Sequence, residues 1–281
     1  MGSSHRGHRA FVTDGDGSNS SANQPLLFRR FVRPVLENQQ EVIWAVTLFP
    51  LVFVMSMALG KLFAPALYRY VIREDNVVEY ATALAYLLAC TFAVALALDL
   101  HRQRERVYAV LYFFLSAGLF LIAMDEISWG QRIFNIKTPE FFERRNQKAE
   151  ITFHNMYGFP LHKAFVVVGF YGAFSRLLLS RSFKRHHPML VELLTPPYRL
   201  FFFFFATFSL YAYYEYLYYW YLSPLGLQWS GFFTDESFID GKDQEPIELL
   251  LSLGFLLFVA VNWYRYAQGR RVGSNAPRSG S

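Results

Sequence analysis

The chain has 281 residues, of which 53% are hydrophobic and 19% aromatic, and its formal net charge is +5. This composition is too apolar for an ordinary soluble domain of that length, and we expect no nucleic-acid partner. Cys90 is the only cysteine, which excludes an intramolecular disulfide and a Cys-based zinc site. The sequence therefore predicts an all-α integral membrane protein, a bundle of about six transmembrane helices with an additional interfacial helix.

The N-terminal segment, residues 1–40, is rich in Gly, Ser, Asn, His and Asp. Such a segment cannot bury enough apolar surface to fold alone, so we predict a flexible tail. At its end, Arg29, Arg30 and Arg33 stand among apolar residues. They belong either to a short basic amphipathic helix on an anionic membrane surface or to a solvated linker. We assign residues 41–266 to the transmembrane domain and residues 267–281 to a basic tail.

The transmembrane domain contains repeated apolar runs. A helix needs about 20 residues to cross ~30 Å of hydrocarbon, and each run is long enough. The predicted spans are residues 42–63, 76–98, 107–134, 160–180, 198–222 and 246–266. The third span is extended past Glu126 because apolar residues recur at helical spacing as far as Phe134. At about 28 residues it is longer than the hydrocarbon is thick, so its polar end protrudes or packs against other helices.

The connection after the third span contains a predicted helix start at Thr138-Pro139-Glu140. A threonine hydroxyl can cap a helix, proline suits the first helical position, and an acid suits the positive end of the helix dipole. Residues 141–153 then mix polar and aromatic side chains. We place them along the membrane interface or folded back over the bundle.

The distribution of charge predicts the orientation. With six spans, both tails lie on one side, and that side carries 17 of the 27 Lys and Arg residues. Because positively charged connections stay in the cytoplasm, we expect both termini to be cytoplasmic. Most acids then fall on the opposite side, at the entrances to the second and sixth spans and in the connection between the third and fourth.

These acids are spaced so that helices bring them together. Residues three or four apart share a helix face, which pairs Asp75 with Glu79, Glu245 with Glu248, and Glu150 with His154. Glu126 stands at the polar end of the third span. We therefore expect one acidic pocket on the non-cytoplasmic side, where these groups meet.

Two kinds of chemistry suit such a pocket. In the first, a divalent metal is held by Glu126, Glu150, His154 and one of Glu79 or Glu248, and activates a water. In the second, a desolvated carboxylate acts as acid or base while Arg132 holds an anionic group. Residues expected to contact substrate are Trp129, Gln131, Asn146, Gln147, Asn155, Glu79 and Glu248. The structural alternatives are that Glu150 and His154 share a common helical spacing by chance and that Arg132 forms a salt bridge.

The predicted function is an enzyme acting on a lipid or lipid-linked substrate, with Glu126, Arg132, Glu150 and His154 as catalytic residues. Its partners are the bilayer and a lipid headgroup. The alternatives are a transporter, in which membrane carboxylates bind protons or cations, and a structural or assembly subunit whose polar network holds helices together.

The connection also resembles a known pattern. EISWGQR (residues 126–132), TPE (138–140), N-Q-x-x-E (146–150) and HN (154–155) are similar to a signature of uncharacterised multi-pass membrane proteins, mostly bacterial. The resemblance implies a membrane bundle and no particular activity. The chain is also loosely similar to ceramidase-like membrane hydrolases. It lacks their H-x-x-x-H pair, so the resemblance does not imply their zinc chemistry.

Overall fold

The computed structural model describes residues 40–73, 77–146, 148–153, 156, 161–213, 216 and 242–274, except for the side chains of residues 268–274. Most of these residues are helical, and they contain no strand, only an isolated bridge between Asn146 and Met156. The prediction of an all-α fold is confirmed. Of the predicted N-terminal tail, residues 1–40, the structure describes only Gln40, whereas residues 267–274 of the predicted C-terminal tail continue the last helix, which ends at Ser274.

Five segments of the described chain are long and apolar enough to cross a membrane. They are Gln40–Phe63, Pro65–Arg102, Arg106–Glu126, Pro188–Ala212 and Glu245–Ala267. The chain is therefore a multi-pass membrane protein. Lipid-facing surface is abundant on α2 (Gln40–Phe63), where Pro50 is the buried residue and Phe63 is 82% exposed.

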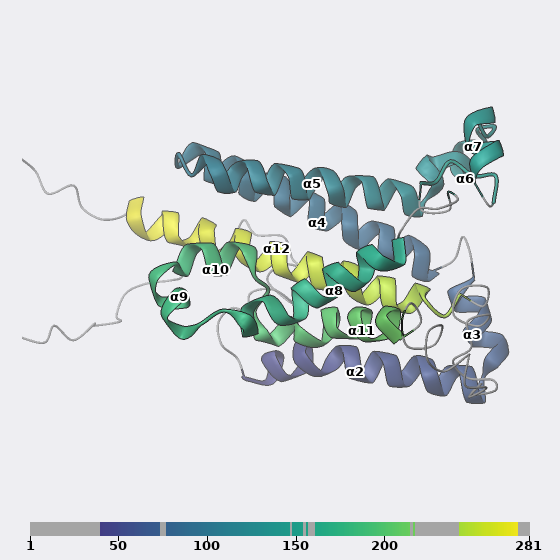
Figure 1. Ribbon diagram of the computed structural model, residues 1–281, viewed down its shortest axis with the longest axis horizontal. Coiled ribbons are helices and arrows are strands. Elements are labelled where there is room, and N and C mark those ends of the chain that lie inside the picture. The colour runs from purple at the N-terminus through teal and green to yellow at the C-terminus, as the bar shows by residue number, and fades with distance from the viewer. Residues whose placement is uncertain are drawn as a thin grey trace, which may run out of the picture.

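The helices form a bundle in which α4 (Val77–Arg102) packs between α5 (Arg106–Glu126) and α12 (Glu245–Ser274) (Figure 1). Alanines recur every fourth residue along α4, and all are buried: Ala85, Ala89, Ala93 and Ala97. Small side chains at this spacing let neighbouring helices approach closely, which is how membrane helices commonly pack.

A second pair of helices, α8 (Leu161–Leu178) and α11 (Phe201–Ala212), packs beside α12. Gly169 and Gly172 of α8 face α11 at very short range. A Cβ atom at Gly169 would lie 2.6 Å from the backbone nitrogen of Phe208, and one at Gly172 would lie 2.2 Å from the ring of Phe204. The two glycines therefore permit this contact.

The start of α2 and the end of α12 lie at the same end of the bundle, which we call the tail end (Figure 1). Two short helices, α9 (Arg181–His186) and α10 (Pro188–Leu194), lie there too. The opposite end, called the acidic end, carries the short helices α3 (Pro65–Ile72), α6 (Gln131–Phe134) and α7 (Glu140–Arg145).

The third predicted span is wrong at its C-terminal end. Helix α5 stops at Glu126, because Ser128, Trp129 and Gly130 have φ angles of 47°, 54° and 73°. This left-handed turn includes η2 (Ser128–Gly130) and redirects the chain into α6. The apolar residues that continued the helical pattern, Ile133 and Phe134, are exposed on the short helix instead.

Other predicted bounds differ too. The apolar segment that corresponds to the predicted fifth span begins at Pro188, ten residues before the predicted start, and α12 continues to Ser274, eight residues beyond the predicted end. The predicted fourth span, residues 160–180, coincides with α8, which is not one of the five segments named above.

Pro139 precedes α7 as its N-cap instead of taking the first helical position, and the Thr138 hydroxyl makes no cap. Helix α4 runs to Arg102, beyond the predicted end at residue 98. Residues 198–200 form a separate 3-10 turn, η3 (Tyr198–Leu200), before α11. Most of residues 213–222, the predicted end of the fifth span, lies outside the described part of the chain.

Candidate acidic functional site

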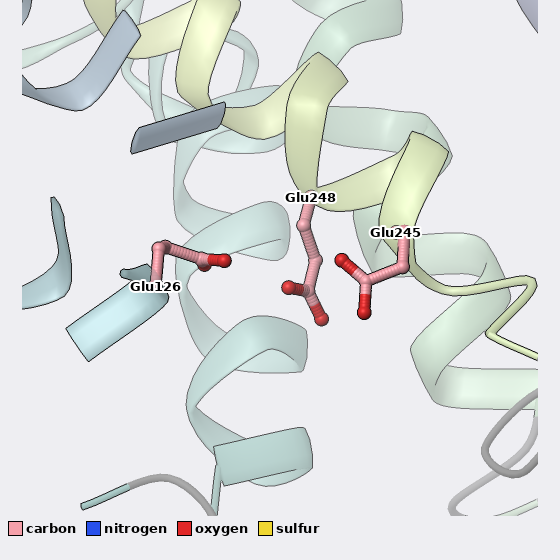
Figure 2. A group of neighbouring side chains, drawn as sticks. All are labelled: Glu126, Glu245 and Glu248. Carbon is pink, nitrogen blue, oxygen red and sulfur yellow. The ribbon is translucent and has the colours of Figure 1, made fainter. Parts of the chain in front are cut away.

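Three glutamates meet at the acidic end of the bundle. Glu126 is the last residue of α5, while Glu245 and Glu248 lie in the first turn of α12. One carboxylate oxygen from each lies within 4.8 Å of the others. Figure 2 shows the three side chains pointing toward one another from the two helices. We call this set the acidic cluster.

The environment of the acidic cluster is largely enclosed. Glu245 and Glu248 are each 7% exposed, and Glu126 is half-buried. The positive end of the α12 dipole favours Glu245 and Glu248, but Glu126 sits at the negative end of α5, which disfavours its charge. Lys242 donates a hydrogen bond to Glu245 at 3.4 Å and gives this carboxylate a cationic partner.

Two tyrosines adjoin the cluster. The Tyr211 hydroxyl of α11 donates a 2.5 Å hydrogen bond to Glu248, and the Tyr211 ring lies 5.5 Å from that of His162. The Tyr86 hydroxyl of α4 is buried, has no hydrogen-bond partner among the described residues, and lies within electrostatic range of Glu126 and Glu248. A buried polar atom without a partner is uncommon in folded proteins and marks a place where a ligand or water can bind.

A second polar network holds the segment that leads away from the cluster. Arg132 forms an ion pair with Glu150, and Ser128 donates to the same carboxylate at 3.3 Å. Gln131 donates to Thr138 at 2.6 Å and accepts from the backbone of Ile151 at 2.8 Å. We call these residues, together with Asn146, the loop network.

Asn146 organises the turn that closes the loop network. It is 4% exposed, and its amide group donates to the carbonyl and the hydroxyl of Thr152, both at 2.8 Å. Its side-chain oxygen accepts from the backbone of Lys148 at 2.8 Å. Asp125, beside Glu126, accepts from the backbone of Phe153 at 2.7 Å and so ties this turn to the end of α5.

The structure thus divides the predicted site. Glu126 and Glu248 converge as expected, and Glu79 lies within electrostatic range of Glu126. Glu150 and Arg132 pair with each other in the loop network instead of joining the described carboxylate group. The structural alternative given for Arg132, a salt bridge, is the arrangement that the structure shows.

Three of the residues expected to contact substrate have structural contacts instead. Gln131 and Asn146 form hydrogen bonds with the backbone, and Trp129 packs edge-on against Phe120 and Phe153. His154, Gln147, Asn155 and Asp75 lie outside the described residues.

Tyr86 and Tyr211 were not among the predicted site residues. Glu245 was expected in the acidic pocket because it shares a helix face with Glu248, although no separate role was assigned to it. Tyr86 lies seven residues, or two helical turns, after Glu79 and thus on the same face of α4. No feature of the sequence marked Tyr211 as a site residue, because its neighbours in α11 are mostly aromatic.

Replacing Asn146 with alanine is expected to loosen the loop network. The variant loses both side-chain bonds to Thr152 and the acceptor for Lys148, which should cost about 2 kcal/mol locally. Hydrogen exchange followed by mass spectrometry should show faster exchange across residues 127–153, with α4 and α12 unchanged. Lys137→Ala, an exposed change in the same connection, is the control. Equal exchange in both variants would contradict the assigned role.

Searches against protein-family models, curated proteins and solved structures found no match to this chain.

Proposed function

We propose that the chain is a membrane enzyme in which the acidic cluster binds a divalent cation and acts on a lipid or lipid-linked substrate. The observation that carries the proposal is the approach of three carboxylate oxygens to within 4.8 Å, contributed by α5 and α12. Three ionised carboxylates at this range repel one another strongly in a partly buried site. A dication bound among them would replace that repulsion with attraction.

The ligand chemistry favours a hard cation. All three candidate ligands are carboxylates, which suit Mg²⁺, Mn²⁺ or Ca²⁺ better than softer metals. The cation would polarise a substrate oxygen and lower the pKa of a bound water. Glu126 is the best placed of the three to act as a base. The negative end of the α5 dipole disfavours its ionised form, so this carboxylate accepts a proton more readily.

The tyrosines would position the reacting groups. The hydrogen bond from Tyr211 fixes one oxygen of Glu248 and so limits how its carboxylate can turn. The buried Tyr86 hydroxyl has no hydrogen-bond partner within the described part of the chain and could bond a water or a substrate oxygen beside Glu126. The segment after α5 also helps to hold the site, because the hydrogen bond from the backbone of Phe153 to Asp125 fixes the chain immediately before Glu126.

The surroundings support a substrate that enters from lipid. The segment after α5 exposes large apolar side chains at the acidic end: Ile133, Phe134, Ile136, Phe141 and Phe153. Lys137, Arg144 and Arg145 lie among them and suit an anionic headgroup region. We propose that this segment is the interfacial element and that it borders the path of an ester, amide or phosphate group toward the cluster.

The proposal includes six spans with both tails in the cytoplasm. Helix α8 adds a sixth crossing to the five long apolar segments, since its 18 residues extend for about 27 Å. An even number agrees with the start of α2 and the end of α12 lying at one end of the bundle. The excess of Lys and Arg at that end is the reason for assigning it to the cytoplasm.

The test uses purified full-length protein in lipid nanodiscs. Binding of Mn²⁺ is measured by electron paramagnetic resonance, with Mg²⁺ and Ca²⁺ as competitors. We expect Glu126→Gln to weaken Mn²⁺ binding at least tenfold, whereas Glu143→Gln, which alters an exposed acid, leaves it unchanged. Failure of the wild-type chain to bind any of these cations at millimolar concentration would refute the cation site.

The catalytic part is tested separately with nanodiscs made from total polar lipid. Mass spectrometry should detect a cation-dependent lipid product that wild-type protein forms and the Glu126→Gln variant forms at least 100-fold more slowly. Cation binding without any product, combined with cation flux across proteoliposomes that Glu248→Gln abolishes, would support the transporter alternative and reject the enzyme.

A further inference from the structure

Asp243 stands two residues before Glu245, just ahead of α12, and both of its carboxylate oxygens bind residues of other helices. Lys61, in the last turn of α2, forms an ion pair with Oδ2, and the Tyr68 hydroxyl of α3 donates to Oδ1 at 2.8 Å. The Asp243 side chain is 9% exposed and that of Lys61 is 20% exposed. The chain that leads into α12 is therefore fixed to α2 and α3 in a place largely shielded from water.

These contacts orient α12 from outside the helix. An aspartate near the start of a helix commonly accepts hydrogen bonds from the first backbone N–H groups of that helix. The Asp243 oxygens bind α2 and α3 instead, while the backbone carbonyl of Gln244 accepts from Ile247 at 2.9 Å and from Glu248 at 3.1 Å. Asp243 thus sets the placement of the first turn of α12 relative to two other helices.

Helix α3 is itself held firmly against the bundle. Tyr68 and Ile72 are 8% and 2% exposed, and they form a small buried cluster with Val78 of α4. Leu249 of α12 packs against this cluster and directly follows Glu248 in the chain. The Tyr68 hydroxyl therefore belongs to a packed side chain, and the contact extends to the turn of α12 that carries the acids.

The orientation of this turn decides the geometry of the acidic cluster. Glu245 and Glu248 both lie in the first turn of α12, whereas Glu126 comes from α5. Helix Cα atoms lie about 2.3 Å from the helix axis, so a rotation of about 20° moves them by about 0.8 Å and moves the carboxylates farther. A binding site needs its groups held within about 0.5 Å of the productive geometry. A small rotation of α12 is therefore enough to spoil the site.

We propose that Lys61, Tyr68 and Asp243 are positioning residues, which hold the first turn of α12 so that its two glutamates face α5 and bind the cation. The inference rests on the proposed function of the acidic cluster. The opposite charges of Lys61 and Asp243 make it testable. By charge alone, loss of the lysine favours cation binding and loss of the aspartate opposes it, whereas loss of positioning weakens binding in both cases.

The affinity of the full-length protein for Mn²⁺ in nanodiscs, measured by electron paramagnetic resonance, tests the inference. We expect Lys61→Gln, Asp243→Asn and Tyr68→Phe each to weaken Mn²⁺ binding at least fivefold and to change the zero-field splitting of the bound ion. The Lys61→Gln, Asp243→Asn double variant should bind no more weakly than the weaker single variant, because both changes break the same contact. Arg69→Gln, which removes an exposed cation beside Tyr68, is the control and should bind as wild type does.

Tyr68→Phe is also tested without any cation, because it removes one hydrogen bond and leaves every charge in place. Amide exchange in peptides covering residues 242–250 should be at least fivefold faster than in the wild type. Stronger Mn²⁺ binding by Lys61→Gln would overturn the inference, since it indicates an effect of charge alone, and so would unchanged exchange in Tyr68→Phe. Faster exchange in Tyr68→Phe, in a protein that binds no cation, would support the positioning of α12 and refute the cation site.

Discussion

Glu248→Gln is expected to raise the melting temperature of the cation-free protein and to remove the stabilisation that a divalent cation gives to the wild-type chain. The substitution removes one negative charge from three carboxylates whose oxygens lie within 4.8 Å. Gln keeps a side-chain oxygen that can accept the Tyr211 hydrogen bond, so the change mainly relieves repulsion. We expect a gain of about 1–2 kcal/mol without cation, in the range of electrostatic effects at partly buried sites.

With a bound cation, the wild-type chain should become more stable than the Glu248→Gln variant. A cation at 100 times its dissociation constant stabilises the folded state by about 2.7 kcal/mol. The wild-type chain keeps all three carboxylates, whereas Glu248→Gln has lost one of them. The measurement is thermal unfolding in detergent, with a chelator and then with saturating Mg²⁺, Mn²⁺ or Ca²⁺. Glu143→Gln is the control and should follow the wild type in both conditions. A Glu248→Gln variant that melts lower without cation and gains as much from it would contradict the proposed site.

Gly169→Ala is expected to be the most destabilising single change in the bundle that leaves every charge in place. The added Cβ would lie 2.6 Å from the backbone nitrogen and 2.9 Å from the Cα of Phe208. Backbone atoms cannot turn aside as a flexible side chain can, so α8 must move away from α11. We expect a loss of about 3 kcal/mol, near the upper end for overpacked cores.

Gly118→Ala on α5 is the matched control, because a Cβ there would meet no atom within 4 Å. The same substitution in an open helix position should be neutral or stabilise by up to ~1 kcal/mol, since alanine favours helix more than glycine does. Reversible unfolding in mixed micelles gives both values. Equal stability of the two variants would show that the close contact between α8 and α11 is absent in the folded protein.

Much of the signature read from the sequence has a structural role. The spacing around Gln131, Asn146 and Glu150 was attributed to substrate or metal contacts, because amides, acids and a guanidinium are rare next to membrane spans. In the fold, these side chains satisfy one another and the turning backbone. A connection that reverses direction at a membrane surface needs such bonds as much as an active site does.

The sequence alone determined that the chain is helical and crosses a membrane, because the length and apolarity of each run are local properties. It also identified Glu126, Glu79 and Glu248 as residues at the same end of the bundle, since helix direction alternates from span to span. Only the tertiary structure decided which acids meet. The close packing of α4, α5 and α12 joins Glu126 to Glu245 and Glu248, while a left-handed turn after α5 directs Arg132 and Glu150 into a network of their own. Contacts between distant segments depend on helix rotation and packing, which hydrophobic periodicity does not specify.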